Sequence, residues 1–210
     1  MKKLLFIVFI TCSPMLLSAQ SSKIVDSLLN HQCREIIVLK EDCIGCLTLN
    51  RPCEKYGEDG NFENFYIFWR NDKKMYVKKT NICGQSKAYQ IKKWNKNPFD
   101  LVNAKRVALD TTQLKYPLHF IQKDSIWVES SLNHNQFYTL DFPAHQIKTI
   151  KINGKAFKEI DKDSQLYADL DIELKKNIPR YIFNNQTAAK ELLDILDAKI
   201  LALRKKIETK

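Results

Sequence analysis

Cysteine spacing is the most distinctive chemical feature of this sequence. Five cysteines follow an N-terminal apolar segment, and four of them fall between positions 43 and 83; the five are Cys33, Cys43, Cys46, Cys53 and Cys83. In an oxidising compartment, cysteines of this kind usually form disulfides. Because five is odd, one thiol is free, pairs between molecules or is otherwise occupied. We expect Cys43 to pair with Cys46 or Cys53, and Cys83 to pair with one of the others.

The C-x-x-C pair also suggests redox chemistry as an alternative. A predicted strand at 36–40, a two-residue loop and a helix opening at Cys43 give a local order that resembles thioredoxin-like proteins. The resemblance implies that Cys43 attacks a disulfide and that Cys46 resolves the mixed intermediate. It also implies that Pro179 faces the pair, although Pro179 lies 133 positions after Cys46. Asp42 stands where these proteins carry an aromatic residue.

No metal or cofactor site is predicted. Four cysteines have the ligand count for zinc, but exported proteins seldom keep four thiolates reduced; these are Cys33, Cys43, Cys46 and Cys53. The histidines lack paired metal-binding spacing; they are His31, His119, His134 and His145. Phosphate-loop, dinucleotide and nucleophile-elbow motifs do not occur. The sequence therefore favours a non-catalytic protein.

Positive charge is concentrated in one segment. Residues 70–106 hold 11 basic and 2 acidic residues, whereas residues 107–210 hold 16 basic and 14 acidic ones. Such a segment attracts polyanions, and the expected partners are an anionic glycan, a lipid headgroup or another polyanion. The alternative is a lysine-rich edge that only keeps the protein soluble. The candidate anion-binding residues are Lys73, Lys74, Lys78, Lys79, Lys92, Lys93 and Lys96.

The N-terminus predicts export. Two lysines, an apolar run at 4–10 and small residues up to Ala19 are typical of a signal peptide over residues 1–19. Residues 20–210 then form a single domain in the periplasm or outside the cell, since they contain no further apolar segment of spanning length. Lipidation at Cys12 is the alternative, but the residues before it match the processing site poorly.

The leader and composition resemble those of exported Bacteroidota proteins. The resemblance rests on the Ser-Ala-Gln end of the leader and the Lys-, Asn- and Ile-rich composition. It implies a location in the periplasm or at the cell surface. Taken with the cysteines and the charge, it predicts a binding or structural protein that is stabilised by disulfides.

The patterns of hydrophobicity predict an α+β fold with an antiparallel sheet built from hairpins. Residues 65–70 alternate with two apolar faces, which is typical of a central strand, and Asn71-Asp72 turns the chain into a strand at 75–77 whose flanking lysines are typical of a sheet edge. A short N-terminal helix follows Ser21-Ser22.

Three predictions concern the C-terminal half. Asn153-Gly154 between alternating runs predicts a hairpin, and residues 179–183 predict a late strand or extended segment. Apolar residues at steps of four and three predict a long helix over about 187–207. Its apolar face is widened by Leu192 and Leu201, which favours packing on the sheet of its own domain.

Overall fold

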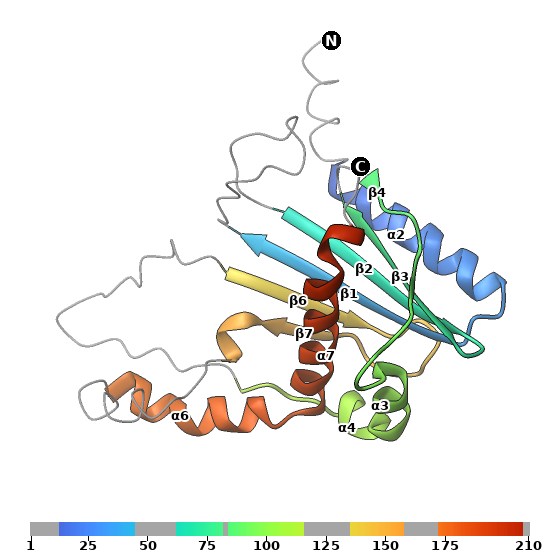
Figure 1. Ribbon diagram of the computed structural model, residues 1–210. Helices are drawn as coiled ribbons and strands as arrows, with labels where there is room; N and C mark the ends of the chain where they lie inside the picture. The colour runs from blue at the N-terminus through green and yellow to red at the C-terminus, as the bar shows by residue number, and fades with distance from the viewer. Residues whose placement is uncertain (1–12, 45–61, 82–83, 116–134, 158–171, 208–210) are drawn as a thin grey trace, which may run out of the picture.

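The computed structural model describes residues 13–44, 62–81, 84–115, 135–157 and 172–207. A seven-stranded antiparallel sheet in the order β4-β3-β2-β1-β6-β7, with β5 also paired to β3, forms the centre (Figure 1). The strands are β1 (Glu35–Ile44), β2 (Phe62–Asn71), β3 (Lys74–Asn81), β4 (Gly84–Gln85), β5 (Tyr89–Ile91), β6 (Asn135–Asp141) and β7 (Ile150–Asn153). Helices pack on the sheet, so the α+β prediction is confirmed.

The β2–β3 hairpin lies where the sequence predicts it. Phe68 pairs with Val77 across the hairpin, and Asp72 takes a positive φ of 54° in the turn. The apolar residues of β2 point alternately to the two faces of the sheet, and each face is covered by its own core, with Phe68 in one and Ile67 in the other. The suggestion that β3 is an edge is wrong, since β4 and β5 both pair with it.

The strand β7 corrects the prediction for Asn153-Gly154. The chain continues from β7 into a 3-10 turn, η1 (Gly154–Ala156), rather than reversing into a hairpin there. The hairpin partner of β7 is β6, which precedes it in the sequence. A Cβ atom on Gly154 would lie 3.0 Å from the Gln136 carbonyl oxygen, so the glycine permits close packing against β6.

One face of the sheet is covered by α7 (Ala188–Leu203), α3 (Pro98–Ala104) and α4 (Arg106–Asp110) (Figure 1). Thr187 caps α7, because its hydroxyl oxygen accepts a hydrogen bond from the Lys190 amide at 3.2 Å. Leu192 and Leu196 are fully buried, which confirms that the helix packs on its own sheet. Leu201, expected to widen the apolar face, is instead 72% exposed.

The segment 179–183 is helical, which corrects the predicted strand. It lies inside α6 (Ile172–Asn185), with Pro179 in the helix interior. Two contacts hold the end of this helix: Tyr181 is buried, and the fully buried Asn184 amide donates to the carbonyls of Lys115 and Ala156 at 2.8 and 2.9 Å. This anchoring offsets the hydrogen bond that a proline removes.

The second face of the sheet carries α2 (Ser13–Asn30), which packs Ile24, Val25 and Leu28 near Ile36 and Ile67. This helix begins at Ser13, before the predicted cleavage site after Ala19. Cleavage at that site stays a prediction. None of the described helices is sufficiently long and apolar to cross a membrane. The last turn of the C-terminal helix is η2 (Arg204–Lys206). The sequence also predicts a pair of strands at 118–121 and 125–129, and both lie outside the described residues.

Candidate functional site

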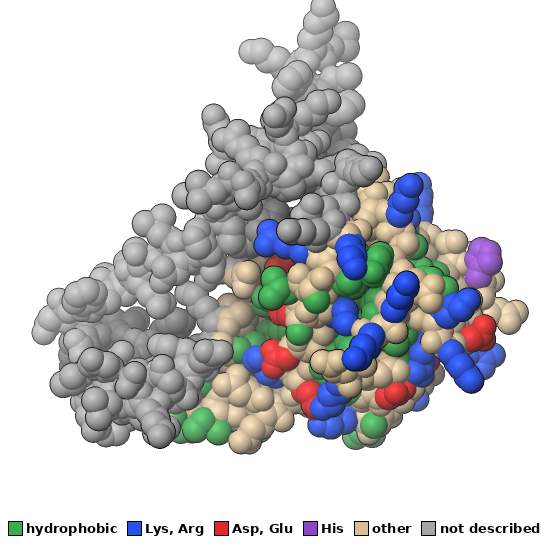
Figure 2. All heavy atoms as spheres, viewed as in Figure 1, with side chains coloured by type: hydrophobic (Ala, Val, Ile, Leu, Met, Phe, Trp, Pro, Cys, Tyr) green, Lys and Arg blue, Asp and Glu red, His purple; other side chains and the backbone are tan. Residues whose placement is uncertain are grey.

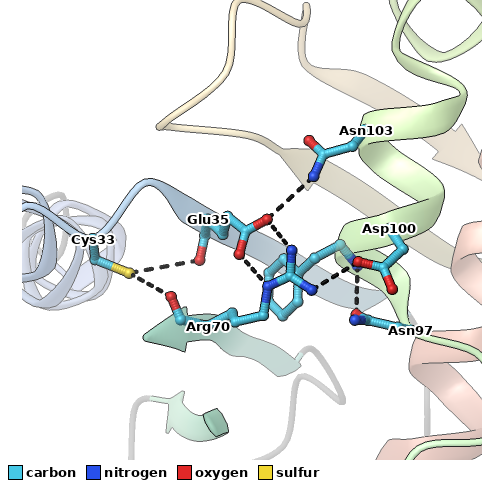
Figure 3. A network of polar contacts seen from close by, with 7 residues as sticks. Cys33, Glu35, Arg70, Asn97, Asp100 and Asn103 are labelled. Atoms are coloured by element: carbon cyan, nitrogen blue, oxygen red, sulfur yellow. Dashed lines mark hydrogen bonds and ion pairs between the residues drawn. The ribbon is translucent and has the colours of Figure 1, made fainter. Parts of the chain in front are cut away.

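Arg70 lies at the centre of a polar network between the sheet and α3 (Figure 3). Its guanidinium forms a two-point ion pair with Glu35, and Nη1 donates to Asp100 Oδ1 at 2.7 Å. The hydrogen bonds to Glu35 raise the pKa of Arg70. Asn103 also donates to Glu35, at 3.2 Å, so β1, β2 and α3 are joined through one side chain. We interpret the role of this network as structural, because its charged side chains form ion pairs with one another.

Cys33 belongs to the same network through its thiol. The sulfur donates to the main-chain oxygens of Arg70, at 3.4 Å, and Glu35, at 3.6 Å (Figure 3). It is a free thiol, and burial raises its pKa. A buried thiol with a raised pKa is a poor nucleophile.

We expect Cys33 to be the unpaired cysteine of the protein. A thiol-directed alkylating reagent should modify it about a hundredfold more slowly in the native state than in urea, because the thiolate is the reactive form. Peptide mass mapping of the unreduced protein measures this, and it also tests the bridges predicted among Cys43, Cys46, Cys53 and Cys83. Cys33 in a bridged peptide, or labelled at the rate of an exposed thiol, would contradict the assignment.

Cys43 lies within a strand, which corrects part of the redox hypothesis. It is paired with Phe62 on β2 and with Gln136 on β6, so it does not open a helix. The lowered pKa of a thioredoxin-like nucleophile depends on a helix N-terminus, which Cys43 lacks. Cys46, Cys53 and Cys83 lie outside the described residues.

A second polar cluster lies beneath α7. Glu41 on β1 is directly opposite Asn64 on β2 and Tyr138 on β6. Burial raises the pKa of Glu41, against a hydrogen bond from Asn64 that lowers it. Asp197 on α7 faces this carboxyl group, and burial, followed by the charge of Glu41, raises the pKa of Asp197 to about 7.

This cluster can hold a proton near neutral pH. Burial also raises the pKa of both Tyr66 and Tyr138, so both phenols stay neutral and able to donate hydrogen bonds. Two neighbouring carboxyl groups with raised pKa values titrate as a pair. Among the described residues, no three histidine, cysteine or acidic side chains lie close enough to share a metal ion.

The third feature is a row of cations along α7. The segment 89–96 runs beside the helix in the opposite direction: Lys206 Nζ donates to the Tyr89 hydroxyl at 3.2 Å, Lys199 Nζ donates to the Lys93 carbonyl at 2.7 Å, and Lys96 pairs with Glu191. We call the cations from the segment 89–96, the end of α7 and η2 the basic ridge; they are Lys92, Lys93, Lys96, Lys199, Arg204 and Lys206.

The basic ridge combines lysines with aromatic rings. Lys199 Nζ lies 5.4 Å from the centre of the Trp94 ring, and Lys206 Nζ lies 5.4 Å from that of Tyr89. Contacts of this kind hold flexible lysines in place while leaving their charge near solvent. Figure 2 shows lysine and arginine side chains gathered on this face, with hydrophobic side chains between them.

The structure separates the predicted anion-binding lysines into groups. Lys92, Lys93 and Lys96 belong to the basic ridge, and Lys79 lies on the same face of the sheet, over the Tyr66 ring. The other three lie elsewhere: Lys74 and Lys78 alternate with Val77 and point to the opposite face, and Lys73 lies in the turn.

The contribution of α7 and η2 to this site was not predicted from the sequence. Lys199, Arg204 and Lys206 lie more than 100 positions from Lys92 and Lys93, and charge counted along the chain does not show which segments pack together. The helical spacing offered a partial signal, since Lys199 and Lys206 are seven residues apart and share one side of the helix.

Comparisons of this chain with protein-family models, with curated proteins and with solved structures gave no match in any of the three.

Proposed function

We propose that the protein is an exported, non-catalytic binding protein that holds an anionic partner on the basic ridge. The observation that carries the proposal is the convergence of cations from two segments about 100 positions apart. Contacts between Lys199 and Lys93 and between Lys206 and Tyr89 fix this convergence. The row runs from Lys96, which pairs with Glu191, to Lys206. At 1.5 Å per residue between positions 191 and 206, it is about 22 Å long.

The charge balance on α7 supports this function. Glu191 is shared by Lys96 and Lys105, whose hydrogen bonds lower its pKa, and Asp194 pairs with Lys190. Among the described residues, no carboxylate forms an ion pair with the five cations of the basic ridge other than Lys96. The basic ridge therefore keeps a net positive charge, which attracts polyanions through counterion release.

Reversing two charges of the basic ridge tests the proposal. In Lys92→Glu/Lys93→Glu, we expect affinity for fluorescent heparin to fall at least tenfold, because two attractive contacts become repulsive. The logarithm of the wild-type association constant should fall linearly with the logarithm of salt concentration. The double variant should make that slope shallower by about 2, since each lysine contributes about 1. Fluorescence anisotropy between about 50 and about 200 mM salt measures both quantities.

The matched control reverses two exposed lysines away from the basic ridge. Lys23 lies on α2, against the opposite face of the sheet, and Lys148 lies before β7, at the far edge from β3. Lys23→Glu/Lys148→Glu changes the net charge equally, so it should keep most of the affinity and slope. Salt-insensitive binding by the wild type, or equal losses in both variants, would contradict the proposal.

A further inference from the structure

The outward side of the last two turns of α7 is apolar. Leu201 is 72% exposed, and Ala198 and Ala202 are exposed beside it. At 3.6 residues per turn these three side chains fall on one strip of the helix surface. A single exposed leucine is common on protein surfaces, so the strip gains meaning only from the charges around it.

Cations border this apolar strip on both sides. Lys199 and Lys206 lie on the side that faces the segment 89–94, where they contact Trp94 and Tyr89. Arg204 lies on the other side, close enough to Glu41 to influence its titration. The strip is therefore enclosed by side chains that favour an anionic surface.

We infer that the anionic partner is a lipid surface, on which the apolar strip of α7 rests while the basic ridge contacts the headgroup phosphates. This inference rests on the proposed function. Amphipathic helices bind membranes in this way, with apolar side chains at the boundary between headgroups and acyl chains and cations among the phosphates. In this arrangement Leu201 contacts the acyl chains, whereas a soluble polyanion would offer no apolar surface for Leu201 to contact.

The aromatic rings of the basic ridge favour lipid over a glycan partner. Sugar and nucleobase rings bind proteins by stacking on free aromatic faces. At Trp94 and Tyr89 the lysine ammonium groups occupy such faces, at 5.4 Å from each ring centre. A stacking ligand would have to displace them, whereas phosphate groups can bind the ammonium groups where they are.

The acids of α7 are compatible with this arrangement. Glu191 and Asp194 are paired with lysines and lie toward the N-terminal half of the helix, away from Leu201. Asp197 is the acid closest to the strip in sequence, and it faces Glu41, Tyr66 and Tyr138 on the sheet. Its negative charge is reduced near neutral pH, because burial favours its protonated form.

Vesicle binding by the protein recovered after export tests the inference. The probes are vesicles of phosphatidylcholine alone and vesicles of equal parts phosphatidylcholine and phosphatidylglycerol, with heparin as a soluble polyanion. We expect co-sedimentation only with the phosphatidylglycerol vesicles. Leu201→Ser should weaken that binding about fivefold by removing an apolar side chain from the interface, and should leave heparin binding unchanged. Because Leu201 is exposed, the substitution spares the core.

Val107 on α4 provides the matched control. Val107→Ser removes another exposed apolar side chain, 76% exposed on α4, and should not change vesicle binding. Binding to heparin without binding to either vesicle would overturn the lipid assignment and leave the proposed function intact. Binding to neither probe would overturn both. Vesicle binding that is unaffected by Leu201→Ser, or weakened equally by Val107→Ser, would overturn the role given to the apolar strip.

Discussion

Replacing Asp197 with asparagine is expected to increase the free energy of unfolding by about 2 kcal/mol at pH 8. Burial and the charge of Glu41 raise the pKa of Asp197 from 3.8 to about 7 in the folded protein. At any pH between these two pKa values, Asp197 therefore keeps its proton in the folded state but has lost it in the unfolded chain. Wild-type stability should fall as the pH rises through this window, since ionising Asp197 costs more in the folded protein.

The magnitude follows from the same difference in pKa. The change from 3.8 to about 7 corresponds to about 4 kcal/mol, and partial exposure of the side chain to water reduces the expected effect to about 2 kcal/mol. Asparagine has nearly the same shape but no charge, so it removes the penalty above pH 7. At pH 4, where the folded-state Asp197 is protonated, the variant and the wild type should have similar stabilities.

Urea unfolding at pH 4, 6 and 8 measures this effect. The control is Asp194→Asn, one turn earlier on α7, where the exposed carboxylate pairs with Lys190. Loss of that pair should change stability by less than about 0.5 kcal/mol at any of these pH values. A wild-type protein whose stability does not fall between pH 4 and pH 8, or equal effects of the two variants, would contradict the assignment.

The Asp197 cluster shows why sequence analysis found only part of the candidate site. Glu41 and Asp197 are 156 positions apart, and neither belongs to a motif. Their proximity depends on where α7 crosses the sheet, which no local pattern specifies. The same reason explains why only the half of the basic ridge that comes from residues 92–96 was predicted.

Elements with strong local signals were predicted well. The hairpin between β2 and β3 follows from alternating apolar residues and from Asp72, which tolerates a positive φ. The long C-terminal helix follows from its heptad spacing and the Thr187 cap. In both cases the local preference agrees with the packing in the folded protein.

Predictions failed where tertiary contacts override a local preference. Pro179 suggested an extended segment, but the buried Asn184 holds the helix around it in place. Asn153-Gly154 suggested a hairpin, but Gly154 instead serves the close approach to β6. Cys43 was expected at a helix start, but β1 continues through it because β2 and β6 supply partners on both sides.

Arg70→Met is expected to destabilise the protein by about 3 kcal/mol, because it leaves the Glu35 carboxylate without its cation in a partly buried position. Both side chains are mostly buried, at 21% and 20% exposure. Methionine retains much of the apolar stem of arginine, so most of the loss reflects the uncompensated charge. The free energy of unfolding from urea titration at pH 7 measures it.

A double-variant cycle separates this pairing from general damage to the fold. Glu35→Gln/Arg70→Met removes both charges, so it should be more stable than Arg70→Met alone by about 1 kcal/mol or more. Asp100→Ala removes the second partner of Arg70, but Asp100 is 65% exposed and its loss should cost less than about 1 kcal/mol. Additive losses in the double variant would mean that Arg70 acts through packing on Phe99, 5.6 Å away, and not through Glu35. A non-additive result would show that the Arg70–Glu35 ion pair itself stabilises the pairing of β1 with β2.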